Sequence, residues 1–123
     1  MNLADRKLYR YDATAAAPKA SYAIPDPGCP AAGDWRSGGL GVHDGVVFVG
    51  GVCSAESTQK IADKWVVIRT FDAAAGTFGG VVVNQPLTFK RGDALWNGSN
   101  THFWNPWQAK YQPPAPQGGS LLA

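Results

Sequence analysis

The amino-acid sequence predicts an all-β protein made of antiparallel four-stranded meanders. Composition is the first indication, because 15 glycines and 9 prolines in 123 residues, with Glu56 as the single glutamate, disfavour helices. The second is a series of short β-branched and aromatic runs bounded by glycine, aspartate and asparagine, which is typical of strands joined by tight turns. The third is a strand–turn–strand unit that occurs twice along the chain.

The strands are expected in this order: Leu8–Tyr11, Leu40–Val42, Val46–Val49, Trp65–Ile68, Val81–Val83 and, as a further candidate, Leu87–Phe89. His43–Gly45 is expected to be a tight turn, because Asp-Gly supplies the positive-φ positions of a hairpin. Asp72–Gly76 is expected to be a second turn, with Gly76 as its positive-φ residue. Helical structure is limited to one turn within the loop Ser57–Asp63, and Gly38–Gly41 is expected to be a turn or bulge. The residues expected in the core are Val47, Val49, Trp65, Val67, Phe71 and Val82.

The repeated unit has a period of 60 residues. Tyr11-Asp12-Ala13 recurs as Phe71-Asp72-Ala73, and each copy continues into a small-residue turn, an apolar strand and a proline. With the strands expected between the copies, each repeat holds four antiparallel strands, which is the content of one β-propeller blade. The alternative is that two similar hairpins arose by chance in a β-sandwich. A blade-like domain is therefore expected over residues 1–110, and the Pro-then-Gly/Ser composition of residues 111–123 predicts a linker or tail.

Six segments follow one another in a characteristic order: Leu8–Asp12, Ile24–Cys29, Gly33–Arg36, Gly45–Gly50, Val52–Glu56 and Arg91-Gly92. Over residues 7–107 they resemble a propeller-like repeat segment of large bacterial secreted or cell-surface proteins that also carry immunoglobulin-like repeats of the clumping-factor type. The resemblance implies about one and a half blades, that is, a β-propeller fragment or a small β assembly. It also implies that the chain needs neighbouring blades, further copies of itself or a different compact packing to cover its strands.

Cys29 and Cys53 are the only cysteines, and their spacing fits neither a zinc site nor a C-x-x-C redox motif. One interpretation is a structural disulfide, which would indicate an oxidising compartment. The other is a pair of unrelated buried or free thiols. The resemblance to exported proteins favours the disulfide.

The segment Trp96–Tyr111 gathers five aromatic rings among amides and hydroxyls, and these are the candidate contact residues: Trp96, Phe103, Trp104, Trp107 and Tyr111. Flat rings flanked by Asn and Gln suit stacking on sugars, and aromatic rings are also typical of protein-binding hot spots. The remaining interpretation is that the rings cover the base of a small β core or dock on a neighbouring blade.

No enzyme, metal or cofactor motif stands out. His43 and Asp44 are adjacent in a turn, so they are not expected to act as a base and its orienting partner. With Glu56 as the only glutamate, a paired-carboxylate glycosidase would have to use turn aspartates. Asp26 and Asp34 do not have the spacing of an EF-hand calcium loop. We expect a protein that is not an enzyme and carries no cofactor.

Charge and hydropathy limit the partners. The net charge of +2 is too small to indicate nucleic acid or an anionic membrane, and no apolar run of about 18 residues predicts a membrane-spanning helix. The first ten residues lack the apolar core of a signal peptide, so the chain is expected to be either cytosolic or a piece of a longer exported protein.

The resemblance implies a secreted or cell-surface location, and a Cys29–Cys53 disulfide would agree with it. The expected function is that of a non-catalytic structural and interaction segment of an exported bacterial surface or filament-forming protein, self-associating through β edges and aromatic loops. Its expected partners are further copies or neighbouring blades. The alternative is a carbohydrate-binding module that uses the Trp96–Tyr111 segment to contact a glycan.

Overall fold

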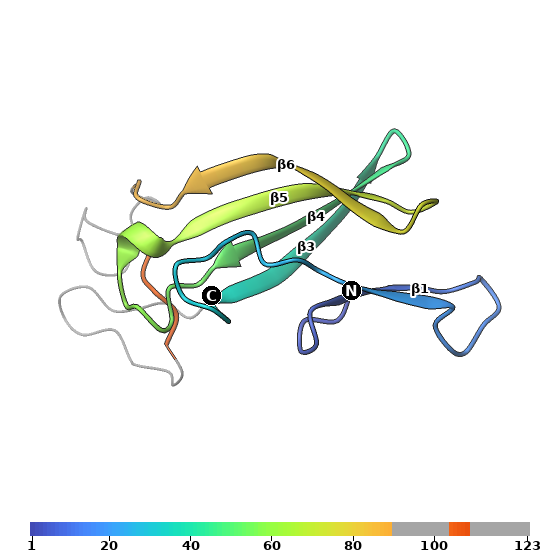
Figure 1. Ribbon diagram of the computed structural model, residues 1–123, viewed down its shortest axis with the longest axis horizontal. Coiled ribbons are helices and arrows are strands. Elements are labelled where there is room, and N and C mark those ends of the chain that lie inside the picture. The colour runs from blue at the N-terminus through green and yellow to red at the C-terminus, as the bar shows by residue number, and fades with distance from the viewer. Residues whose placement is uncertain (90–103, 109–123) are drawn as a thin grey trace, which may run out of the picture.

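The computed structural model describes residues 1–89 and 104–108, and in this part the regular secondary structure is β-strand apart from one 3₁₀ turn (Figure 1). The elements are β1 (Lys7–Arg10), β2 (Ala20–Ala23), β3 (Trp35–His43), β4 (Val46–Cys53), the 3₁₀ turn η1 (Ile61–Asp63), β5 (Trp65–Asp72) and β6 (Thr77–Pro86). Every strand pair is antiparallel. The all-β, antiparallel prediction is therefore confirmed.

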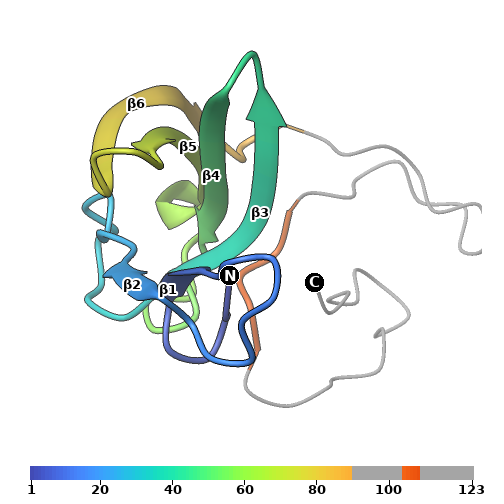
Figure 2. The ribbon, with the colours of Figure 1, turned by 90° about the vertical axis from the view of Figure 1, so that its right-hand side faces the viewer.

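Four of the strands form one open, blade-like sheet in the order β3-β4-β5-β6, and β1 and β2 form a separate two-stranded hairpin. Figure 2 shows the sheet curving around, with the hairpin lying beneath its concave side. We call the side of the sheet that faces the hairpin the inner face and the opposite side the outer face. The sheet does not close, so β3 and β6 are its two edge strands among the described residues.

Local sequence accounts for the two turns of the sheet. Asp44 and Gly45 have φ angles of 48° and 78° and connect β3 to β4 as a two-residue hairpin, which the Asp-Gly pair favours. In the turn after β5, the Asp72 carboxylate accepts hydrogen bonds from the backbone N–H groups of Ala74 and Ala75, and Gly76 has a φ of 70°. Both turn predictions are confirmed.

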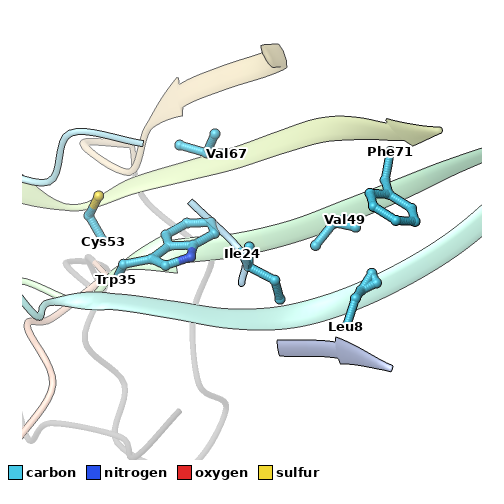
Figure 3. Packing of buried hydrophobic residues seen from close by; sticks show 7 residues of the cluster. All are labelled: Leu8, Ile24, Trp35, Val49, Cys53, Val67 and Phe71. Atoms are coloured by element: carbon cyan, nitrogen blue, oxygen red, sulfur yellow. The ribbon is translucent and has the colours of Figure 1, made fainter. Parts of the chain in front are cut away.

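The inner face and the hairpin enclose one hydrophobic core (Figure 3). Its buried members are Leu8, Ile24, Trp35, Val49, Cys53, Val67 and Phe71. Five of the six residues predicted for the core take part in it, with Val47 and Trp65 half-buried against the cluster. The prediction for Val82 is wrong: its side chain is 54% exposed. Val82 lies on an edge strand and at a register shift opposite Ile68 and Arg69, so no neighbouring element covers it.

Other expectations differ in detail. The strand expected at Leu87–Phe89 is absent, because β6 ends at Pro86, which has no N–H to continue the ladder. Leu87 instead lies buried, and its N–H donates to the Lys64 carbonyl at 2.8 Å. The glycine segment after Trp35 belongs to β3 and carries a bulge between Ser37 and Gly39, as the glycine run indicated.

The two copies of the repeated unit both form hairpins, but they differ in packing. Phe71 is buried, whereas Tyr11 at the equivalent position is 56% exposed. The first hairpin stands alone as a two-stranded sheet, and the second continues the four-stranded sheet. The repeat of 60 residues and its assignment to a propeller stay predictions. The division into a domain over residues 1–110 and a tail over residues 111–123 also stays a prediction, because both the boundary and the tail lie outside the described residues.

Gly51 sits where a side chain would collide with the core. A Cβ built on Gly51 would lie 2.6 Å from the Trp35 ring and 2.8 Å from the Ser37 Cα atom. We expect Gly51→Ala to lower the free energy of unfolding by about 1–3 kcal/mol, as overpacking does in well-packed cores. Gly38→Ala is the matched control, because nothing lies within 4 Å of its Cβ position. Urea unfolding curves for the two variants should separate clearly, and equal midpoints would contradict the close packing of Trp35 on β4.

Candidate functional site

The two edge strands of the sheet expose apolar side chains beside unpaired backbone groups. On β3 the exposed residues are Leu40 and Val42, the latter 69% exposed, and on β6 they are Val81, Val82 and Val83. No charged residue occurs anywhere in Thr77–Pro86. Proteins usually protect such edges with charged residues, prolines or short strands, because an unpaired edge is a template for another strand. β6 is long and uncharged, with a terminal proline and a register shift as its only such features.

An apolar groove continues from the β3 edge onto the inner face. It has a volume of about 180 Å³ and is lined mainly by Leu8, Tyr22, Leu40, Val42, Val47 and Phe71. The hairpin covers only part of the inner face, which explains why Val42 remains exposed although it pairs with the half-buried Val47. The β3 edge therefore offers a continuous apolar strip rather than isolated side chains.

The outer face carries a second, shallower groove with a glycine floor. Gly39 pairs with Gly50, and Gly50 pairs with Ile68, so this row of the sheet lies on the face opposite Val49 and Val67. The groove has a volume of about 430 Å³ and is bordered at one end by Trp107. The sheet is thus apolar on both faces, which is typical of sheets that are covered on both sides.

Residues 104–108 dock beside the loop that follows β4. The Trp107 N–H donates to the Ser54 carbonyl at 3.0 Å, and the Gln59 side-chain amide donates to the Trp107 carbonyl at 2.9 Å. Gln108 in turn donates to the Gln59 side-chain oxygen at 2.6 Å. The buried Lys64 ammonium donates to the Asn105 carbonyl. These bonds hold the segment to the end of the sheet through its backbone.

Two of the five predicted aromatic contact residues are therefore placed. Trp104 and Trp107 are both half-buried; the Trp104 ring meets the Phe89 ring edge-on at 6.3 Å between centroids. The Arg36 guanidinium carbon lies 5.9 Å from the centre of the Trp107 ring. The remaining three residues lie outside the described residues: Trp96, Phe103 and Tyr111. A common contact surface of all five rings stays a prediction, and so does the glycan contact.

Polar side chains near the docked segment 104–108 bond to one another and fix the loop after β4. The buried Asp34 carboxylate accepts hydrogen bonds from the Ser57 hydroxyl at 2.6 Å and from the Ser57 N–H at 3.1 Å. The carboxylate of Glu56 forms a 2.5 Å ion pair with Arg36. These bonds fix the loop after β4 against the start of β3, which is where residues 104–108 dock.

No group of three or more His, Cys, Asp or Glu side chains that could hold a metal ion occurs in residues 1–89 and 104–108. His43 and Asp44 approach each other at 3.4 Å, but both side chains are more than 80% exposed. That pair lies at a turn tip and not in a cavity. Within the same ranges, no helix is long and apolar enough to span a membrane.

The disulfide prediction is confirmed. Cys29 and Cys53 are bridged, with their Cα atoms 5.5 Å apart. The bond ties the loop after β2 to the last residue of β4, and Cys53 is itself buried in the core. It borders a cavity of about 160 Å³ lined in part by Trp65, Pro27 and Pro30. The bridge is consistent with an oxidising compartment such as the extracellular space.

One charged residue of the inner face was not anticipated from the sequence. Arg69 interrupts the apolar run of β5, and the Nε and NH1 atoms of its guanidinium are buried without a hydrogen-bond partner among the described residues. An arginine inside a run of valine and isoleucine was the available signal.

Comparisons with protein-family models, with curated proteins and with solved structures find no match to this chain. The functional argument therefore depends on the chain's own surfaces.

Proposed function

We propose that this chain is a non-catalytic structural and interaction module of an exported bacterial surface or filament-forming protein, and that it associates with itself through the edges of its sheet. The supporting observation is the open four-stranded sheet, whose two edge strands both expose apolar side chains. A soluble protein that functions alone rarely leaves such edges unprotected. The disulfide and the resemblance to surface proteins support export.

Edge pairing would remove two sources of instability together. A new strand satisfies the unpaired backbone N–H and C=O groups of the edge, and it shields the side chains beside it. Full burial of a Val or Leu side chain contributes roughly 1.5–3 kcal/mol. Val42 and Val82 keep more than half of their surface exposed, so part of that gain is available when another strand covers them.

The segment around Trp107 is a second element of the proposal. Trp107 lines the outer-face groove together with Arg36, so the ring and the glycine floor of the groove belong to one surface. A neighbouring sheet could cover that surface as one blade covers the next. Residues 96–103 belong to the same aromatic segment by sequence, and their part in the surface is an expectation.

The test is the mass of the protein in solution as a function of concentration. We expect light scattering after size-exclusion chromatography to show assemblies that grow with concentration, and electron microscopy to show rings or fibres. Val82→Lys is expected to weaken association on the order of tenfold or more, because the ammonium would have to be desolvated at the new strand pair.

Ile61→Lys is the matched control. Ile61 is also an exposed aliphatic residue, but it lies in the 3₁₀ turn η1 and not on an edge strand. The control variant should assemble as the unaltered chain does. A protein that stays monomeric at every concentration reached would contradict the proposal, as would equal weakening by both lysines.

A further inference from the structure

We infer that copies of this chain join head to tail, with β6 of one copy against β3 of the next, and that Arg69 of the first copy pairs with Asp44 of the second. This inference rests on the proposed self-association and specifies which surfaces meet. It follows from three observations: the direction of the edge strands, a half-buried guanidinium without a carboxylate partner beside one edge, and an exposed carboxylate at the other edge.

The strand count permits continuation of the sheet without any reorientation. The meander has four antiparallel strands, so its first strand, β3, and its last strand, β6, run in opposite directions. A second copy placed beside the first in the same orientation therefore brings its β3 antiparallel to β6. The inner faces of both copies then lie on the same side, and each copy again presents a free β6. Such a heterologous contact generates a ring if it closes and a fibre if it does not.

Arg69 marks the β6 side of the interface. It pairs with Val49 on one side and with Val81 on the other, and Val49 belongs to the core, so Arg69 lies on the inner face. Its guanidinium carbon is 5.9 Å from the centre of the Phe78 ring, which places the charge above the edge strand. Nε and NH1 are buried, and among the described residues no carboxylate pairs with the group. Arg69 as a whole is half-buried, and a charge partly removed from water without a carboxylate partner gains from an incoming anion.

Asp44 marks the β3 side. It follows Val42 by two residues, in the turn that ends β3, and its only partner among the described residues is the equally exposed His43. The other carboxylates near β3 are already engaged, since Asp34 accepts hydrogen bonds from Ser57 and Glu56 pairs with Arg36. Asp44 is therefore the carboxylate that the β3 edge can offer.

The two charges lie at the same end of the sheet. The β3–β4 turn and the β5–β6 turn share that end (Figure 1). If Val42 of the incoming copy stands opposite Val81, its Asp44 falls beside Gly79, next to the Phe78 ring over which Arg69 lies. The apolar side chains of the two edges then meet in the same register that brings the opposite charges together. Neighbouring strands are about 4.8 Å apart, so the two charged side chains have to bridge about 10 Å across β6.

The symmetric alternative leaves the charges unpaired. Pairing β6 with β6 of a second copy would give neither Arg69 guanidinium a carboxylate partner across the interface. A contact through β6 alone would also stop at a dimer, whereas the β6–β3 contact leaves a free β3 at one end and a free β6 at the other.

The experiment compares the concentration dependence of assembly for the unaltered chain, Asp44→Asn, Arg69→Glu and the charge-swapped double variant Arg69→Glu with Asp44→Lys. We expect each single variant to weaken association on the order of tenfold and the double variant to regain most of the loss. Asn tolerates the positive φ of residue 44, so Asp44→Asn should keep the turn. Asp12→Asn, another exposed carboxylate, is the matched control and should leave assembly unchanged.

The outcomes separate the two proposals. A chain that never associates overturns the proposed function and this inference together. A chain that associates but is unaffected by Asp44→Asn keeps the proposed function and overturns the head-to-tail pairing, and so does a mass that levels off at a dimer. Far-UV circular dichroism shows whether Arg69→Glu folds. If it does not, Asp44→Asn and the effect of salt still test the Arg69–Asp44 pairing. We expect association to weaken when the salt is raised from about 0.05 M to about 0.5 M, and unchanged association would contradict the pairing.

Discussion

Replacing Trp35 with alanine is expected to lower the free energy of unfolding by about 3–5 kcal/mol, as truncation of a buried aromatic side chain does. Trp35 begins β3, is 1% exposed and has its ring against the backbone at Gly51. Small domains are stabilised by only about 5–15 kcal/mol in total. Trp35→Ala should therefore be largely unfolded at temperatures where the unaltered chain is folded, as urea titration followed by far-UV circular dichroism can measure.

Trp35→Phe separates packing from hydrogen bonding. The indole Nε1 of Trp35 is buried with no hydrogen-bond partner among the described residues, so the ring stabilises the core through contact alone. Phenylalanine keeps most of that contact and removes the unsatisfied donor. We expect Trp35→Phe to cost less than half of what Trp35→Ala costs. A loss below about 1 kcal/mol for Trp35→Ala would show that the core does not depend on this ring.

Reducing the Cys29–Cys53 disulfide is expected to lower the free energy of unfolding by about 3 kcal/mol. The bond closes a loop with a sequence separation of 24 residues, and that loop contains β3 and β4. Without the bond, the unfolded chain regains the freedom of that loop, and the segment after β2 loses its attachment to the sheet. The measurement is urea unfolding of the unaltered chain with and without a thiol reductant.

The double variant with Cys29→Ala and Cys53→Ala is the control for that experiment. It should unfold at lower urea than the oxidised chain and should not respond to the reductant. Identical unfolding of the oxidised and reduced forms would mean that the bridge contributes nothing to stability.

The sequence predicted those features of the fold that depend on neighbouring residues. Asp44-Gly45 and Asp72–Gly76 form turns because their own backbone and side-chain chemistry demands it. The strands of the sheet follow from β-branched runs, although β3 and β6 extend beyond the predicted segments. The separate strand expected at Leu87–Phe89 is wrong, because the sheet ends at Pro86 and Leu87 packs into the structure without strand pairing.

The candidate site was predicted less completely. The sequence singles out Trp104 and Trp107 as unusual rings, but the bonds of Trp107 to Ser54 and Gln59 join residues about 50 positions apart, which no local pattern encodes. Arg69 is the one charged residue next to the apolar run of β5, but the sequence does not tell which face of the sheet its side chain takes. Its significance arises from the strand beside it and from the absence of a paired carboxylate among the described residues.

By itself, the sequence determined the class of the fold, the position of the sheet's turns and the candidate cysteine pair, because backbone preference and side-chain alternation act over a few residues. Only the tertiary structure decided which face of each strand is buried, that β3 and β6 form the edges, and that Val82 is exposed while Trp35 is enclosed. These outcomes depend on which distant segments pack together. The free energy gained by that packing is a property of the assembled sheet and cannot be assigned to any one stretch of the chain.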